Sequence, residues 1–411
     1  MLEQHADRKT NLATLLMKLG VCAALVFANV LSVSASLFAQ DQAQQERPQA
    51  YYTVIPHKSV IPGAFVAPVS GTTIPLWNYS IKSPLDNNTY SGTMVGRSPF
   101  FHGARTTNVP TIIVPLKIVF SGGATFDPTA TDSTCSPSGT PLSLTQHSPL
   151  FTPLDITMGG VDMGVTQYID AFQRANFFTE VSPTGSRYHT ALSPVTTLSA
   201  VTVNVPAADG SVFSTTSFGG CGGTIGVMNI NWFDPEVTGT IIPSLAASGV
   251  GPSNFAFFVL KNVVMTSGTP SFPSNCCILG YHSAFAAAGS PVQTYSPADY
   301  DTSGIFSGVS TVTAMSHEIG EWMDDPIPTN IASTPAWGHI GQVGGCQTNL
   351  EVGDPLSGTE FPPLLASNGV TYHMQELAFF SWFYRQVPSI GVSGFYSDND
   401  TFSSDAGAVC H

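Results

Sequence analysis

Charged residues are scarce in this chain of 411 residues, and basic residues are the scarcer kind. Only 10% of the residues are charged, and 13 Lys and Arg stand against 27 Asp and Glu, which gives a formal net charge of −14. A surface that binds nucleic acid needs a basic face. This balance therefore argues against a nucleic acid as the partner.

Signatures of several common enzyme classes are also missing. The sequence has no G-x-S-x-G motif, which removes the anchor for a serine hydrolase of that type, and it has neither a P-loop nor a dinucleotide-binding fingerprint. No C-x-x-C spacing supports a thiolate zinc cluster. The chain is instead rich in Gly (38) and Pro (31) and is 43% hydrophobic. This composition predicts a packed core with many short strands and turns.

The N-terminus has the features of an export signal. Three basic residues precede the apolar stretch Leu19–Val33, and the polar run Gln40–Arg47 follows it. We predict a signal peptide over residues 1–39 that is cleaved near its end, giving a secreted protein, extracellular or periplasmic, with no remaining membrane association. The alternative is a single membrane anchor, but the apolar stretch is shorter than the ~20 residues that span a bilayer.

The loss of Cys22 with the signal peptide leaves six cysteines. An even number in an exported chain predicts up to three disulfides, whose connectivity the spacing does not determine. We expect Cys276 and Cys277 not to pair with each other, because a bridge between neighbours strains the peptide that joins them. The six are Cys135, Cys221, Cys276, Cys277, Cys346 and Cys410.

The pattern of apolar and turn residues predicts an α+β protein with a β-rich N-terminal part. Residues 40–50 are a polar spacer, residues 51–215 form the β-rich domain, and residues 216–411 form a second domain with an important helix and a mixed sheet. Helical periodicity covers Gln167–Phe178, and Pro235–Ala247 is a further candidate helix. Tyr372–Tyr384 is hydrophobic nearly all round, which predicts a buried helix.

Met315–Pro326 has the sequence M-S-H-E-I-G-E-W-M-D-D-P and concentrates the chemistry of the chain. On a helix, His317 and Glu321 are four positions apart and share one face, with Glu318 beside them. The H-E-x-x-H helix of metallopeptidases has this layout, with a second His where this chain has Glu321. We predict that His317, Glu321 and Glu351 hold a metal with one position open to water. Glu318 would then be the general base.

Several residues are candidates for the oxyanion donor and for the third metal ligand. A metal-dependent hydrolase needs a donor for the developing oxyanion, and among Tyr281, His282, Tyr372 and His373 we favour His282 and His373. The third metal ligand is Glu351, with Asp354 or His282 as the alternatives.

These residues resemble the zincin metallopeptidases, most closely a set of secreted bacterial proteins with S-H-E-x-x-E-W-x-x-D-P and a downstream E-V-G-D-P. The resemblance covers residues 276–383, about a quarter of the chain, and implies that residues 216–411 form a zincin-like metal-binding domain with an active-site helix and a mixed sheet. His317 and Glu318 match the zincin motif, Glu321 departs from it, and Glu351 matches as a later glutamate. By analogy with zincins, Ile278–His282 would be an edge strand that holds the substrate backbone beside the active-site helix.

The departure at Glu321 bears on the metal. A site with two histidines and one glutamate leaves zinc with one positive charge, whereas one histidine and two glutamates leave it formally neutral. A neutral centre lowers the pKa of bound water less, and two carboxylates favour harder ions. Zinc is the expected cofactor, with calcium or manganese as alternatives.

The sequence thus predicts a secreted, monomeric, metal-dependent peptidase that acts on a protein or peptide substrate. One alternative is a non-catalytic secreted metal-binding protein that engages a cell-surface or envelope glycan. Another is an ordinary helix, in which Ser316 is the N-cap and Glu318 lies near the positive end of the helix dipole.

Overall fold

The structure is a computed structural model, and it describes residues 47–56, 73–101, 106–131, 135–181, 187–274, 276–286, 291–328, 339–340, 346–347 and 349–405. The predicted signal peptide lies outside these residues, as does most of the polar spacer. Among the described residues, those from Pro48 onward, apart from Ser217–Gly219, form one compact unit. None of the described helices has the length and hydrophobicity needed to cross a bilayer.

The fold is mixed α+β and contains more strand than helix. The strands are β1 (Tyr51–Pro56), β2 (Leu76–Lys82), β3 (Thr89–Val95), β4 (Thr106–Phe120), β5 (Thr125–Phe126), β6 (Leu154–Met158), β7 (Val161–Thr166), β8 (His189–Thr197), β9 (Val201–Val205), β10 (Gly210–Ser214), β11 (Thr224–Asn229), β12 (Phe255–Lys261), β13 (Val263–Thr266), β14 (Cys276–Phe285), β15 (Gln293–Tyr300), β16 (His339–Ile340), β17 (Cys346–Gln347), β18 (Leu364–Leu365) and β19 (Thr371–Tyr372). The α-helices are α2 (Pro141–Gln146), α3 (Tyr168–Asn176), α4 (Phe178–Val181), α5 (Ile230–Glu236), α6 (Ile242–Ser244), α7 (Thr313–Asp324) and α8 (Phe380–Phe383). Short 3₁₀ or π turns are η1 (Pro99–Phe101), η3 (Thr216–Phe218), η4 (Val237–Ile241), η5 (Ala246–Ser248), η6 (Asp354–Leu356) and η7 (Val392–Gly394).

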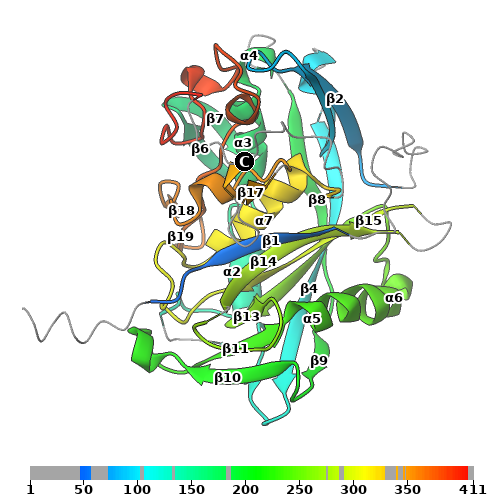
Figure 1. Ribbon diagram of the computed structural model, residues 1–411, viewed down its shortest axis with the longest axis vertical. Coiled ribbons are helices and arrows are strands. Elements are labelled where there is room, and N and C mark those ends of the chain that lie inside the picture. Colours follow the sequence, from blue (N-terminus) through cyan, green and yellow to red (C-terminus); the bar gives the residue numbers. More distant parts are fainter. Residues whose placement is uncertain are drawn as a thin grey trace, which may run out of the picture. The chain divides into compact units, whose positions relative to one another are not determined.

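Eleven strands build one curled, mixed sheet (Figure 1). Its order is β10-β11-β13-β14-β15-β12-β4-β5, with β1 added to β14 and with β8 and β9 added to β4. β12 runs parallel to both β4 and β15, whereas β14 runs antiparallel to both β13 and β15. Strands from before and after residue 215 therefore share this sheet, and the domain division expected there falls inside it.

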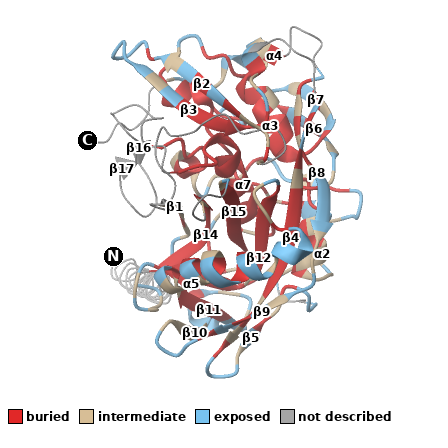
Figure 2. Cartoon of the chain, turned by 90° about the vertical axis from the view of Figure 1, so that its right-hand side faces the viewer, coloured by how far each residue is buried: buried red, intermediate tan, exposed pale blue. Residues whose placement is uncertain are grey.

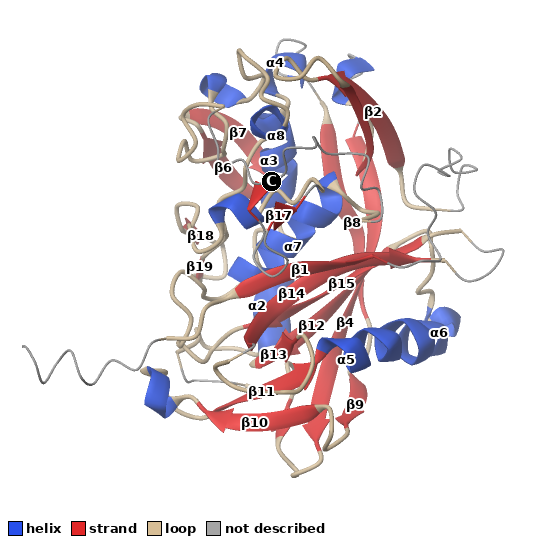
Figure 3. Ribbon diagram, viewed as in Figure 1, coloured by secondary structure: helices blue, strands red, loops and turns tan. Residues whose placement is uncertain are grey.

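The sheet is buried on both faces. Along β12, Phe255 and Phe257 point into one hydrophobic cluster, while Ala256 and Phe258 point into another on the opposite face. Figure 2 shows the central strands buried along their length. Helices α3 and α7 cover one face, and α5 and α6 cover the other (Figure 3). Burial on both faces is the reason for the continuous apolar runs in these strands.

Helix α7 contains the H-E-x-x-E motif and begins three residues before Ser316. Thr313 Oγ1 donates to the backbone oxygen of Ser310 at 2.7 Å and accepts from the backbone nitrogen of Ser310 at 3.1 Å. Ser316 therefore lies inside the helix, where its hydroxyl donates to the Thr313 carbonyl at 2.7 Å. The alternative in which Ser316 is the N-cap is wrong.

All twelve residues of α7 are buried, so the helix is an internal element rather than an amphipathic surface helix. Its Trp322 ring stacks on Phe255 of β12, with ring centroids 3.6 Å apart. Such an aromatic stack adds to the burial of both rings. The contact fixes the motif-bearing helix against the centre of the sheet.

The helix predictions had mixed outcomes. Gln167–Phe178 is confirmed as α3, which spans Tyr168–Asn176. The candidate Pro235–Ala247 lies in a helical stretch that starts earlier, at Ile230. The predicted helix over Tyr372–Tyr384 is wrong, because only Phe380–Phe383 is helical.

Remote hydrogen bonds explain why this last segment does not become a helix. The backbone nitrogen of Glu376 donates to Thr359 O at 2.9 Å, and that of Ala378 donates to Val352 O at 2.8 Å. The backbone groups that a helix would pair locally are thus used by other segments of the chain. A buried extended segment and a buried helix have the same apolar composition, so the sequence pattern could not separate them.

The edge-strand prediction for Ile278–His282 is wrong. β1 pairs in parallel with this part of β14, placing Tyr52 opposite Gly280 and Val54 opposite His282. The backbone edge expected to hold a substrate is therefore already occupied by a strand from the N-terminal part of the same chain.

Two cysteine pairs lie at disulfide distance, Cys135 with Cys221 and Cys276 with Cys277. The expectation that the adjacent cysteines do not pair is wrong. The peptide bond between them is cis, and their Cα atoms are 3.0 Å apart. Cys410 lies outside the described residues, and the side chain of Cys346 is not among those described.

Candidate metal centre

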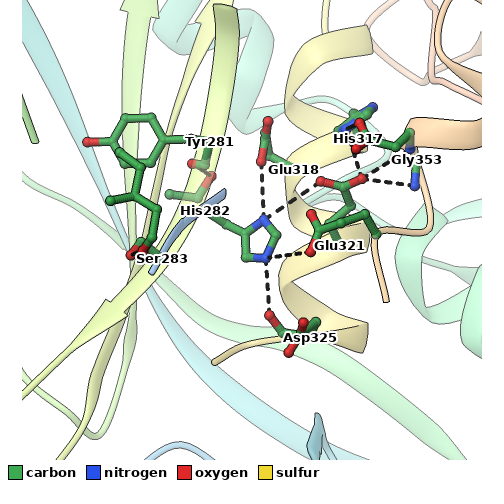
Figure 4. A network of polar contacts seen from close by, with 12 residues as sticks. Tyr281, His282, Ser283, His317, Glu318, Glu321, Asp325 and Gly353 are labelled. Carbon is green, nitrogen blue, oxygen red and sulfur yellow. Dashed lines mark hydrogen bonds and ion pairs between the residues drawn. The ribbon is translucent and has the colours of Figure 1, made fainter. Parts of the chain in front are cut away.

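Three segments that are distant in the sequence meet on the α7 side of the sheet. β14 contributes His282, α7 contributes the motif residues, and the loop after residue 349 contributes Glu351 and Asp354. Figure 4 shows the imidazole of His282 facing Glu318 and Glu321 of the helix. All of these side chains are buried.

His317 is oriented by an amide from the C-terminal part of the chain. Its Nδ1 lies 2.9 Å from Gln375 Oε1, while Gln375 Nε2 donates to Gly353 O at 2.6 Å. An amide oxygen only accepts, so Nδ1 has a proton that it donates to Gln375. The other ring nitrogen, Nε2, faces two acids and lies 3.0 Å from Glu321 Oε1 and 3.6 Å from Asp354 Oδ1. A metal-binding histidine has this arrangement.

His282 repeats the arrangement with its ring nitrogens exchanged. Its Nε2 lies 3.1 Å from the backbone oxygen of Asp325, to which it donates. Its Nδ1 faces Glu318 Oε2 at 3.3 Å and Glu321 Oε2 at 3.8 Å. Burial lowers the pKa of His282 to about 4, although Glu321 acts in the opposite direction. At neutral pH a neutral imidazole therefore directs its lone pair at two carboxyl groups.

Glu321 lies between the two histidines. Its Oε1 accepts hydrogen bonds from the backbone nitrogens of Gly353 at 3.1 Å and Asp354 at 3.2 Å, whereas its buried Oε2 has no hydrogen-bond partner. Burial acts to raise the pKa of Glu321, but His317 and then His282 outweigh it and lower the pKa to about 2. Glu321 is therefore a carboxylate at neutral pH.

Glu318 and Glu351 complete the cluster in a different electrostatic state. Burial, followed by the charge of Glu321, raises the pKa of each well above its usual range. Glu351 Oε1 accepts from Asn349 Nδ2 at 2.6 Å and lies 3.9 Å from His282 Nε2. Glu318 Oε1 and Glu351 Oε2 are buried and accept no hydrogen bond from an N–H or hydroxyl group, although the carboxyl groups of Glu351 and Glu321 share a hydrogen bond that raises the pKa of Glu351 and lowers that of Glu321. Each of these oxygens could accept a further donor or bind a cation.

Two glycines allow this close packing. A Cβ atom added to Gly280 of β14 would lie 2.6 Å from Glu318 Cγ, and one added to Gly353 would lie 2.5 Å from His317 Nδ1. Both distances are too short for real Cβ atoms, so a side chain at either position would displace a motif residue. Gly353 belongs to the E-V-G-D-P motif, which gives that motif a steric role beside His317.

The donor set fits a divalent cation. Within the described part of the chain, the ion pairs of Glu318, Glu321 and Glu351 are with histidine. Buried carboxylates without a positive partner are costly. Two trios have donor atoms within 4.8 Å of one another, namely His317 with Glu321 and Asp354, and His282 with Glu318 and Glu321. One nitrogen and several carboxylate oxygens suit zinc or manganese.

The structure brings together most of the predicted site residues. His317, Glu318 and Glu321 meet as the motif indicated, and Asp354, an alternative ligand, lies beside His317 where Glu351 was expected. Glu351 lies on the His282 side instead. Asp354 therefore completes the trio at His317, whereas Glu351 belongs to neither of the two trios.

His373 is not brought into the cluster. Its Nδ1 lies 3.0 Å from Glu360 Oε2, and both side chains are 30% exposed. Tyr281 packs its ring against Phe233 and Tyr295, and the Tyr372 hydroxyl donates to the Leu144 carbonyl at 2.9 Å. Of the four candidate oxyanion donors, only His282 faces the motif.

Sequence reasoning missed Tyr52, which covers the cluster. Its ring is fully buried and stacks on the imidazole of His317, with centroids 3.7 Å apart and an angle of 18° between the planes. Its hydroxyl has no hydrogen-bond partner, and burial, followed by Glu318 and Glu321, raises its pKa well above the usual range. No local pattern marks this residue, because its role depends on the pairing of β1 with β14.

Comparison with protein-family models, curated proteins and solved structures found no match for this chain. The resemblance to zincins over residues 276–383 therefore remains a prediction from the motif.

Proposed function

We propose that this protein is a secreted, metal-dependent peptidase that hydrolyses peptide bonds with a metal-activated water. One observation carries the proposal. His317 and His282 each turn one ring nitrogen toward buried carboxyl groups, while a carbonyl oxygen accepts a hydrogen bond from the other ring nitrogen of each. A histidine that is oriented in this way beside carboxyl groups is suited to binding a cation.

The proposed ligands of the catalytic cation are His317 Nε2, Glu321 and Asp354, the trio that surrounds the free imidazole nitrogen. When bound, the cation lowers the pKa of a water and polarises the scissile carbonyl. Glu351, the third ligand that the sequence predicted, becomes a neighbour of His282 in this assignment.

Glu318 is the proposed proton acceptor. Its carboxyl group lies on the helix beside the two ligands His317 and Glu321, and a nearby divalent charge favours its ionised form. His282 Nδ1 lies 3.3 Å from Glu318 Oε2 and acts as a positioning residue that fixes the direction of the carboxyl group. Glu318 would take a proton from water and return it to the leaving nitrogen.

Access is the condition for this function. His282, His317, Glu318 and Glu321 are 0% exposed, and Tyr52 lies over His317. β1 also occupies the edge of β14. A peptide that approaches from the β14 side can therefore reach the cation only after β1 and Tyr52 move.

The same closure favours a second function, a non-catalytic protein in which the buried cation stabilises the fold. A structural metal site is closed, whereas a catalytic one keeps a position for water and substrate. This second function predicts bound metal without hydrolysis.

Hydrolysis of labelled casein, measured with the Tyr52→Ala variant beside the wild-type protein, separates the two functions. The peptidase proposal predicts activity that a chelator removes and zinc or manganese restores. Glu318→Gln should lower turnover by about 10²–10⁴-fold, the usual contribution of a general base. Glu360→Gln, which changes an acid outside the cluster, is the matched control and should keep full activity. Bound metal with no hydrolysis in either background would overturn the peptidase proposal and leave the structural one.

A further inference from the structure

The two trios of possible ligands share one residue. Glu321 appears in both, but within the described ranges no group whose donor atoms all lie within 4.8 Å of one another contains both His282 and His317. A single cation at His317 therefore leaves the His282 trio without a cation. The shared residue offers a separate oxygen to each side, Oε1 toward His317 Nε2 at 3.0 Å and Oε2 toward His282 Nδ1 at 3.8 Å.

One of the two distances measured in the second trio fits a coordination shell, and the other is slightly longer. Bonds of about 2.1 Å from a cation to nitrogen and oxygen place neighbouring donor atoms about 3.0–3.4 Å apart in octahedral or tetrahedral geometry. His282 Nδ1 is 3.3 Å from Glu318 Oε2 and 3.8 Å from Glu321 Oε2. A small inward movement of one side chain would complete the shell.

Several atoms of this trio that could bind a metal accept no hydrogen bond from outside the trio. His282 gives its Nε2 proton to the Asp325 carbonyl, so its Nδ1 can only accept. Glu321 Oε2 and Glu318 Oε1 are both buried and without a hydrogen-bond partner. Without a cation, these groups need the proton that burial and Glu321 keep on Glu318, and a bound cation would take the place of that proton.

The charge balance points the same way. Glu318, Glu321, Glu351 and Asp354 are four acids within one buried cluster. Cations that displace the protons on Glu318 and Glu351 leave all four acids ionised, and one divalent cation balances two such charges. Two divalent cations offset all four.

We propose that Glu321 bridges two divalent cations, one held by His317 and Asp354 and a second held by His282 and Glu318. The second position rests on its own contacts, and only its consequence for Glu318 rests on the proposed function. Glu318 is a ligand when the second position is filled, and it is available for proton transfer when that position is empty.

Manganese binding to the full chain tests the proposal without reference to hydrolysis. Chelator-treated protein is dialysed against Mn²⁺, and bound metal is counted by elemental analysis while electron paramagnetic resonance reports whether the ions interact. We expect two equivalents per chain and a spectrum of two coupled ions. His282→Ala should retain one equivalent with an uncoupled spectrum, whereas His373→Ala, a histidine outside the cluster, should retain two coupled ions.

One equivalent in the wild-type protein would overturn the two-cation proposal, as would two coupled ions in His282→Ala. If His282→Ala fails to fold, the wild-type count and spectrum still decide the question. The outcome is independent of the peptidase proposal, which fails only if metal-loaded protein does not hydrolyse peptide bonds.

Discussion

Two clusters of buried acids in this protein differ in how their oxygens are satisfied. Around Glu376, each carboxylate oxygen has protein donors: Oε1 accepts from Ser397 Oγ at 2.5 Å and from the backbone nitrogen of Thr401 at 3.1 Å, and Oε2 accepts from Thr401 Oγ1 at 2.5 Å. The neighbouring Asp398 accepts from Leu377 N at 3.1 Å and from Tyr168 Oη at 2.7 Å. Around Glu321, by contrast, buried oxygens and a histidine nitrogen have no hydrogen-bond partner.

Burial alone therefore does not mark a functional acid. A carboxylate that accepts several hydrogen bonds stabilises the fold, as Glu376 does by joining its own segment to the segment 397–401. Acceptors grouped without donors instead indicate a missing positive partner. The comparison assigns the Glu376 cluster to structure and the Glu321 cluster to cation binding.

The largest expected effect comes from making the same substitution in both clusters. Glu321→Gln should abolish high-affinity binding of divalent cations, because Glu321 belongs to both trios. Glu376→Gln should leave the metal content unchanged and lower the free energy of unfolding by about 2–3 kcal/mol, since it weakens hydrogen bonds to a charged group. Metal analysis and denaturant unfolding of both variants give the two readouts. Equal metal content in the two variants would remove the distinction between the clusters.

A smaller effect is expected at Gln375, which orients His317 from behind. Gln375→Leu removes the acceptor that holds the Nδ1 proton of His317, and such a change usually weakens metal binding by about 10–100-fold. Gln173→Leu is a matched control, because Gln173 donates to Asp324 at 2.8 Å instead. Competition with a chelating dye measures the affinity. Unchanged affinity in Gln375→Leu would show that His317 is not a ligand.

Tyr52 is expected to control how fast the cation leaves the Glu321 cluster rather than how tightly it binds. Tyr52→Ala removes the ring stacked on His317, so a chelator should extract the cation several-fold faster than from the wild-type protein. Tyr52→Phe keeps the ring and should release metal at the wild-type rate. Stopped-flow transfer of metal to the chelator provides the rates, and equal rates in Ala and Phe variants would show that Tyr52 does not close the site.

The smallest effect concerns the pH dependence of stability. Burial raises the pKa of Asp324 to about 8, although the hydrogen bond from Gln173 opposes the shift. Between the unfolded pKa near 3.8 and this value, the folded protein holds a proton that the unfolded chain releases, so stability falls as the pH rises. Asp324→Asn should reduce this slope between pH 5 and pH 8 in chelator-treated protein. Denaturant unfolding at several pH values checks it, and identical slopes would contradict the assignment.

The sequence predicted the helix and the motif because both are local. His317, Glu318 and Glu321 lie within five consecutive positions, and helical spacing alone places them together. Asp354 was identified as an alternative ligand because it follows closely in the E-V-G-D-P motif. The α+β class also followed from the short apolar runs between turn residues.

What the sequence could not predict depends on pairing between distant segments. Tyr52 reaches His317 only because β1 adds to β14 more than 220 residues later in the chain, as the register of Tyr51 with Ile278 shows. Gln375 lies in a segment whose uniform apolar pattern indicated a helix, whereas the structure places it in an extended segment paired with loops. Periodicity reports burial, but it does not report which segment supplies the hydrogen-bond partners.

Anomalous X-ray scattering from crystals grown with Zn²⁺ or Mn²⁺ tests the central claim most directly, because it locates the cation. The claim predicts an anomalous peak about 2.1 Å from His317 Nε2 and between it and the carboxyl groups of Glu321 and Asp354. A map without a peak in the cluster, at metal concentrations that saturate ordinary protein sites, would contradict the claim and leave these acids as a buried, protonated network.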